Sequence, residues 1–214
     1  MKDLYIIGAG GFGREVAWLV ERINQVNPTW NIVGFLDDGR NQEEEINGYK
    51  VLGGCQYLET VEKESWVICT IGSSKIRKNV IEKLAMYSNV RFATLIDPSV
   101  IMSGTVEIGE GTIICAGTIA TVNIKIGNFV TINLDCTIGH DDILEDFVTV
   151  YPSVNISGNV QIGEEVELGT GTQIIQGKTI GQESIIGAGA VVVKNIPEKC
   201  TAVGAPAKPI KFFE

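Results

Sequence analysis

The chain has 214 residues, of which 44% are hydrophobic, and its formal net charge is −9 at pH 7. That length allows one large domain or two small ones, and the acidic balance argues against sequence-independent binding to nucleic acid or to anionic membranes. The five cysteines include no CxxC pair and accompany a single histidine, and no stretch is long and apolar enough for a membrane span, so we expect no metal site and a reducing, cytoplasmic location.

The first predicted element is a strand over residues 3–7, which runs into a glycine turn at residues 8–13 and then a helix over residues 14–23. Glycines let the backbone approach a pyrophosphate closely, and a helix N-terminus presents free N–H groups to an anion. This order therefore indicates a phosphate-binding turn. Its candidate ligand-binding residues are Gly10, Gly11, Phe12 and Gly13. The alternative interpretation is that the glycines only allow tight packing of the helix on the strand.

Three more strands are predicted to alternate with helical and loop segments. They cover residues 32–36, 66–71 and 90–95, with a surface loop at residues 40–50 and a helix from Ser74 to about residue 87 that Ser73 or Ser74 could cap. Such alternation predicts an α/β, Rossmann-like small parallel sheet that binds ligands at the carboxyl ends of its strands. Asp37, Asp38, Gly72 and Ser73 stand at those ends, and the carboxylates could accept hydrogen bonds from a ribose or a base.

A glycine turn of this kind first suggests an NAD-dependent dehydrogenase. The predicted first domain covers residues 1–97 and holds only about four strands, whereas a full dinucleotide fold has about six. The half that would hold the nicotinamide is missing. The sequence therefore predicts no NAD, and a nucleotide or nucleotide-sugar pocket fits the length better.

From Val100 to Asn195 the sequence falls into 16 consecutive blocks of six residues without an insertion. The third residue of every block is apolar, and the fourth is Gly in seven blocks. A six-residue period sustained over this length is typical of a parallel β-helix, in which each block makes one short strand and one turn. With three blocks to a coil, residues three blocks apart should stack on one another.

Pro98 marks the predicted domain boundary. We therefore expect an all-β domain, a parallel β-helix, over residues 98–196. The tail, residues 197–214, is rich in Gly, Ala and Pro at first and is expected to form a cap or an ordered loop. A three-sided prism commonly buries one flat face in a partner, which favours a symmetric oligomer, and a trimer in particular.

The only histidine, His140, follows the inward-facing Ile138 by two residues and so lies at a turn. Asp141 and Asp142 come directly after it, so a carboxylate is available to orient the imidazole. Stacking of residues three blocks apart places Gly158 beside His140 in the next coil, where a free glycine N–H could serve an oxyanion site. Gln176 and Lys194 continue the same corner. No Ser–His–Asp triad is evident from spacing.

The hexads and the later segment VGAPAK at residues 203–208 resemble the left-handed β-helix acyltransferases. Together with GAGGFGRE at the start and GFLDD after the second strand, the whole chain resembles the bacterial sialic-acid O-acetyltransferase family. This family includes N-acetyltransferases of nucleotide-linked amino sugars. The resemblance implies a homotrimer, acetyl-CoA as co-substrate in a groove between adjacent β-helices, and a nucleotide-linked sugar as partner.

The resemblance also implies roles for individual residues. His140 would be the general base, Asp141 its acidic support, and Gly158 the donor to the thioester oxygen. The coenzyme A groove would be built around Gly187 and Ala188 and around the loop at residues 205–208. The full set of expected cofactor-binding residues is Gly158, Gln176, Gly187, Ala188, Lys194, Ala205, Pro206 and Lys208, and the expected sugar-nucleotide residues include Gly11, Asp37 and Asp38.

Relatives that acetylate amino sugars often carry His in the first glycine turn and again nine residues after the base, where this chain has Phe12 and Thr149. The sequence thus predicts an acetyl-CoA-dependent N-acetyltransferase of a nucleotide-activated amino sugar. O-acetylation of sialic acid or a related sugar stays open as an alternative. A non-catalytic protein that binds a nucleotide-sugar is the alternative from another class.

Overall fold

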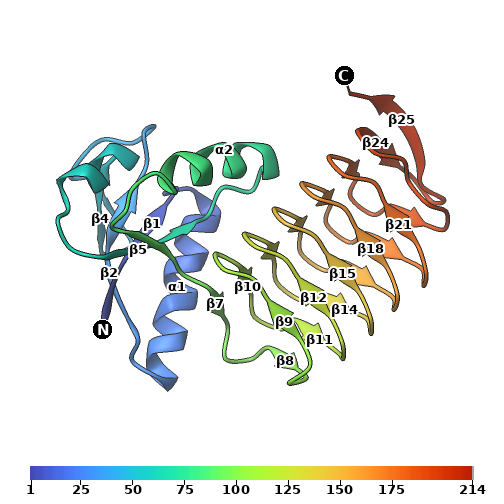
Figure 1. Ribbon diagram of the computed structural model, residues 1–214, viewed down its shortest axis with the longest axis horizontal. Coiled ribbons are helices and arrows are strands. Elements are labelled where there is room, and N and C mark those ends of the chain that lie inside the picture. The colour runs from blue at the N-terminus through green and yellow to red at the C-terminus, as the bar shows by residue number, and fades with distance from the viewer. Residues whose placement is uncertain (214) are drawn as a thin grey trace. The chain divides into compact units, whose positions relative to one another are not determined.

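The computed structural model describes residues 1–213, and the chain divides into two compact units after Pro98. Figure 1 shows the helices and the larger strands of the first unit in blue to green, and the stacked short strands of the second in green to red. Within residues 1–213 no helix combines the length and the apolar character that a membrane span needs.

The first unit is built on a six-stranded sheet with the order β3-β4-β2-β1-β5-β6. Its strands are β1 (Lys2–Ile7), β2 (Trp30–Leu36), β3 (Glu45–Ile46), β4 (Tyr49–Gly53), β5 (Ser65–Cys69) and β6 (Val90–Phe92). Every neighbouring pair is parallel except β3 and β4. A short strand, β7 (Leu95–Ile96), follows β6. The predicted small parallel sheet is therefore confirmed, with two additional strands.

Those additional strands correct the prediction of a surface loop at residues 40–50. Asn47 and Gly48 both have positive φ, 50° and 84°, which is the backbone of a two-residue hairpin turn of type I′. The Asn-Gly pair is a strong hairpin signal, and the surrounding charged residues concealed it. The third strand also ends at Cys69, two residues before the predicted end.

Two α-helices pack with this sheet, α1 (Gly11–Val26) and α2 (Ser74–Leu84), and a 3-10 helix, η1, covers Cys55–Thr60. The apolar spacing of Val16, Leu19 and Val20 gives α1 one buried face, which explains its position against the buried strand β1. Ser73 occupies the N-cap position of α2, but its side chain makes no capping hydrogen bond. Helix α2 ends three residues before the predicted limit.

The second unit contains 16 strands of two residues each, one per predicted hexad. They are β8 (Ile101–Met102), β9 (Glu107–Ile108), β10 (Ile113–Ile114), β11 (Ile119–Ala120), β12 (Lys125–Ile126), β13 (Thr131–Ile132), β14 (Thr137–Ile138), β15 (Ile143–Leu144), β16 (Thr149–Val150), β17 (Asn155–Ile156), β18 (Gln161–Ile162), β19 (Glu167–Leu168), β20 (Gln173–Ile174), β21 (Thr179–Ile180), β22 (Ile185–Ile186) and β23 (Val191–Val192). Strands three apart pair in parallel, so that Ile138 lies opposite Ile156 in the next coil. The predicted left-handed β-helix is confirmed.

The third residues of the hexads from Ile114 onward form the core of this unit, together with much of the first-residue column. From Ile114 to Val192 every one of these third-residue side chains is at most 4% exposed. Hexads also turn sharply at their sixth residue, where φ is positive from Gly111 to Gly189, for example 63° at Asp141. Regular stacking of apolar side chains thus fixes the register, and the turns at the corners carry exposed side chains such as that of His140.

The C-terminal segment continues one sheet of the β-helix. Strand β24 (Cys200–Val203) pairs in parallel with β22 and antiparallel with β25 (Lys208–Phe212). The loop between them contains the cis Ala205–Pro206 peptide. This segment belongs to the same compact unit as the hexads.

Candidate active site

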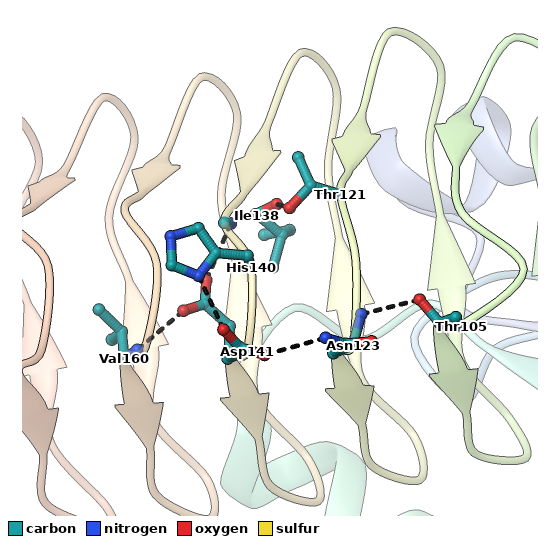
Figure 2. A network of polar contacts seen from close by, with 9 residues as sticks. Thr105, Thr121, Asn123, Ile138, His140, Asp141 and Val160 are labelled. Atoms are coloured by element: carbon teal, nitrogen blue, oxygen red, sulfur yellow. Dashed lines mark hydrogen bonds and ion pairs between the residues drawn. The ribbon is translucent and has the colours of Figure 1, made fainter.

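The turn that follows β14 presents His140 at a corner of the β-helix, where about half of its side chain is exposed. Its Nδ1 lies 2.8 Å from Asp141 Oδ2 (Figure 2). An ionised carboxylate can only accept a hydrogen bond, so Nδ1 donates and the neutral imidazole keeps Nε2 free of a proton. Within residues 1–213, Nε2 has no hydrogen-bond partner. The corner therefore presents a basic nitrogen to solvent.

A ladder of polar side chains holds Asp141 in place. Asn123 Nδ2 donates to Asp141 Oδ1 at 3.2 Å, and Asn123 N donates to Thr105 Oγ1 at 2.9 Å. The three residues lie at neighbouring levels of the β-helix, and Figure 2 shows them side by side along one corner. The hydrogen bond from His140, and then that from Asn123, lower the pKa of the Asp141 carboxyl. Asp141 thus stays ionised and orients the imidazole.

Gly158 lies directly against the imidazole, where the stacking of successive coils predicts it. A Cβ added to Gly158 would lie 2.4 Å from His140 Nε2, so only glycine leaves room for the ring. Within the described residues, the buried N–H of Gly158 has no acceptor. A buried amide left open beside a base is the arrangement an oxyanion site requires.

Asp142 has a different place from Asp141. It is fully buried, and its carboxylate accepts hydrogen bonds from Gly139 N at 2.9 Å and Val160 N at 2.8 Å. Burial raises the pKa of the Asp142 carboxyl to about 7. The hydrogen bonds from the two backbone amides act in the opposite direction and lower this pKa. The order of the residues alone left open which aspartate orients the imidazole, and the family resemblance favoured Asp141. The structure places Asp141 against the ring.

The expected coenzyme A residues are only partly brought together. Lys194, Pro206 and Lys208 line one cavity of about 220 Å³ with their chain neighbours. Gln176, Gly187, Ala188 and Ala205 are not among its lining residues. Gln176 is exposed on the corner that continues from Gly158. The cavity is also lined by Asn195, Ile196 and Pro209, which no sequence signal marked.

In the first unit, the glycines of the turn between β1 and α1 have two different roles. A Cβ on Gly13 would lie 2.0 Å from Gly8 O, so Gly13 serves close packing of helix on strand. A Cβ on Gly10 would meet nothing within 4 Å, and one on Gly11 would approach only Arg14 Nη2, at 3.9 Å. Gly10 and Gly11 are exposed at the helix N-terminus, which suits an anion. The packing interpretation is therefore confirmed for Gly13, and anion binding stays a prediction for Gly10 and Gly11.

Asp37 is already engaged with backbone amides, since its Oδ2 accepts from Ala9 N and its Oδ1 from Gly39 N, both at 2.8 Å. It ties the glycine turn to the end of β2. Asp38 lies beside Gly54, where an added Cβ would come within 1.7 Å of its Oδ1. Of the two carboxylates, Asp38 is therefore the better candidate for a ligand contact.

The other candidates in this unit are Phe12, Gly72 and Ser73. Phe12 is half-buried in the first turn of α1. The fully buried Arg77 donates from Nη1 to Ile71 O at 2.8 Å and to Gly72 O at 3.2 Å, which fixes the turn that carries Ser73. No sequence signal marked Arg77, because a lone arginine in a helix usually lies in solvent. Among residues 1–213, no three His, Cys, Asp or Glu side chains are grouped to hold a metal ion.

The geometry defines a left-handed β-helix protein with a base and an open amide at one corner, joined to a small α/β sheet. Residues 3–84 match the model of the PglD N-terminal domain family. The acetyltransferase domain of PglB from Neisseria gonorrhoeae, also solved in complex with acetyl coenzyme A, is 34% identical. Its superposition covers 98% of this chain and 100% of that domain, with a TM-score of 0.91. The chain therefore belongs to the hexapeptide-repeat acyltransferase family.

Two further relatives match less well, one because its sequence identity is lower and the other because the matched segment is shorter. PerB from Caulobacter crescentus, solved with CoA and GDP-perosamine, is 28% identical, with 99% of this chain and 98% of that chain covered and a TM-score of 0.88. UDP-N-acetylbacillosamine N-acetyltransferase from Bacillus subtilis is 34% identical over 126 residues, which are 54% of this chain and 52% of the relative. The match thus spans about half the length of that curated relative.

Proposed function

We propose that this protein is an acetyl-CoA-dependent N-acetyltransferase that acts on a nucleotide-activated amino sugar. The observation that carries the proposal is the pairing of His140 Nε2 with the open N–H of Gly158. A base and an oxyanion donor on adjacent residues of neighbouring coils suit acyl transfer to a nucleophile that the substrate brings, which removes the need for a Ser or Cys in the protein. The relatives solved with acetyl coenzyme A, and with CoA and GDP-perosamine, support the choice of substrates.

In the proposed reaction the amine nitrogen attacks the thioester carbonyl carbon of acetyl-CoA. His140 Nε2 takes the proton that the nitrogen loses, and Gly158 N–H stabilises the negative charge that develops on the carbonyl oxygen. Collapse of the tetrahedral intermediate forms the amide, breaks the C–S bond and expels the CoA thiolate, which takes up the proton from the imidazolium. Asp141 keeps the imidazole in the tautomer that can start this sequence.

The remaining candidate residues bind the two substrates in this proposal. Lys194 and Lys208 at their cavity offer two positive charges to the phosphates of coenzyme A. Gly10 and Gly11 at the N-terminus of α1, with Asp38, would hold the nucleotide. A homotrimer would cover apolar side chains that one chain leaves in solvent, such as Ile101 at 65% and Ile119 at 39% exposure.

O-acetylation of sialic acid or a related sugar is the second candidate. It is favoured by the carboxylate-supported His140, because a hydroxyl needs a base more than a free amine does. The replacement of two frequent family histidines by Phe12 and Thr149 fits an acceptor other than the usual amino sugars. A non-catalytic nucleotide-sugar-binding protein would have no use for an imidazole that a carboxylate orients beside the open amide of Gly158.

The test is release of free CoA thiol from acetyl-CoA with a panel of UDP-, GDP-, dTDP- and CMP-linked amino sugars, and with free sialic acid. The proposal expects turnover with one nucleotide amino sugar and a fall of about 10²- to 10⁴-fold in His140→Ala. Glu110→Ala removes an exposed side chain from the same hexad position as Gly158, in another coil, and serves as the matched control. Turnover with sialic acid alone would establish O-acetylation, and unchanged turnover in His140→Ala would remove the base from the mechanism.

A further inference from the structure

The backbone ladder of the β-helix is interrupted next to His140. Elsewhere the residue after a strand donates its N–H to a carbonyl of the next coil, as Gly127 N does to Leu144 O at 2.8 Å and Gly163 N to Ile180 O at 2.9 Å. The equivalent bond from Gly139 N to Ile156 O is absent from the described residues. Gly139 N donates to Asp142 Oδ2 instead, at 2.9 Å. The backbone amide of the residue before His140 thus donates to a side chain instead of to the backbone of the next coil.

The turn that contains Gly158 is held in an unusual way as well. In several other turns the amide of the next hexad's first residue closes its own turn, as Thr172 N does with Gly169 O at 3.1 Å and Ala190 N with Gly187 O at 3.2 Å. Val160 N donates to Asp142 Oδ1, at 2.8 Å. One carboxylate therefore holds the residue before His140 and the second residue after Gly158.

The fold itself does not need a carboxylate at this position. Asp142 is the first residue of its hexad, and the other fully buried polar residues in that column are hydroxyls, at Thr112, Thr118, Thr172 and Ser184. Thr112 makes the corresponding link between coils, since Val130 N donates to its Oγ1 at 3.1 Å. A buried charge is costly, and a hydroxyl could make the link without that cost. The carboxylate is present only in the coil that carries the histidine.

We propose that Asp142 is a positioning residue, which sets the placement of His140 Nε2 relative to the Gly158 N–H by drawing Gly139 out of the ladder and holding the Gly158 turn. This inference rests on the function proposed above. It assigns a separate task to each aspartate: Asp141 orients the imidazole ring, and Asp142 fixes the two backbone turns that carry the ring and the oxyanion donor. The titratable groups that act on Asp142 are His140 and Asp141.

Asp142→Thr is the sharpest test, because threonine already occupies this column at Thr112 without interrupting the ladder. We expect the Gly139 N–Ile156 O bond to form, the imidazole to shift relative to Gly158, and kcat to fall about 10- to 100-fold with KM for both substrates within about twofold. Thr112→Val removes the equivalent inter-coil link far from His140 and should leave kcat unchanged. If Asp142→Thr fails to fold, Asp142→Ser repeats the test with the hydroxyl that Ser184 uses.

Two readouts separate positioning from a merely structural role. The acidic limb of log kcat against pH should be shallower in Asp142→Thr than in the wild type, because the variant lacks the buried carboxyl whose pKa is raised to about 7. A crystal structure of Asp142→Thr should show the displaced imidazole. The proposal is overturned if kcat matches that of Thr112→Val, or if kcat falls while His140 keeps its place over Gly158. If the wild type transfers no acetyl group, the proposed function fails, and the position of His140 in that crystal structure alone decides the inference.

Discussion

Asp142 should make the free energy of unfolding of the β-helix depend on pH, and the direction of this dependence follows from the pKa of its carboxyl. Burial raises the pKa of this carboxyl from 3.8 in the unfolded chain to about 7 in the folded one. Between these two values the folded chain holds a proton that the unfolded chain has released. The free energy of unfolding therefore falls as pH rises through this window, by about 1.4 kcal/mol per pH unit. Over the window the loss amounts to roughly 4 kcal/mol.

Asp142→Thr removes this titration while other ionisable groups remain. The variant loses a hydrogen-bond acceptor at every pH, so the informative quantity is the change in its stability relative to the wild type. Between pH 4 and pH 8 the free energy of unfolding of the variant should rise by roughly 4 kcal/mol relative to that of the wild type. Thr112→Val, which titrates nothing, should show a difference from the wild type that is independent of pH.

Denaturant unfolding at several pH values can measure this, provided that the two units are monitored separately. All three tryptophans, Trp18, Trp30 and Trp66, lie in the first unit, so their fluorescence follows that unit alone. Far-UV circular dichroism follows both, and the transition without a fluorescence change belongs to the β-helix. A stability difference between Asp142→Thr and the wild type that stays flat from pH 4 to pH 8 would refute the reasoning.

Three further substitutions test the site directly. Gly158→Ala should lower kcat/KM about 100-fold, since the added Cβ displaces the imidazole, yet change the free energy of unfolding by less than about 1 kcal/mol because His140 can swing into solvent. Gly104→Ala, where a Cβ meets nothing within 4 Å, is the control, and equal kinetics in the two variants would contradict the site geometry. Lys194→Ala and Lys208→Ala should each raise KM for acetyl-CoA several-fold and leave KM for the sugar unchanged, which substrate-dependence curves at fixed ionic strength can check. A rise in KM for the sugar instead would assign the cavity to the other substrate.

The β-helix could be predicted from the sequence because one rule repeats in every hexad. An apolar third residue in each hexad fixes which side chains face inward, and the absence of insertions fixes which residues stack. The first unit offers no such repetition. Its hairpin of β3 and β4 was missed because charged residues on an exposed edge carry no apolar alternation, although Asn47-Gly48 specifies the turn.

The site, like the fold, has some residues whose roles the sequence predicts and others whose roles it does not. The stacking of successive coils places Gly158 against His140 from sequence alone, and the adjacent Asp141 is visible as a neighbour. The contributions of Asn123 and Arg77 could not be predicted in this way. Asn123 acts through a partner one coil away, and Arg77 acts through carbonyl oxygens that its sequence neighbourhood does not reveal.

Asp142 is the instructive case, because the sequence did contain its signal. In a column where buried residues are apolar or carry a hydroxyl or thiol, a carboxylate is an exception that the repeat does not require. Such exceptions cost stability, as the raised pKa of Asp142 shows, so an uncompensated one would be expected to give way to threonine or valine. The exception coincides with the ladder bond that Gly139, the residue before His140, does not make, and this gives the carboxylate a local structural role. In a repeat protein, candidate functional residues are best sought where a side chain differs in chemical type from the others at the same position of the repeat.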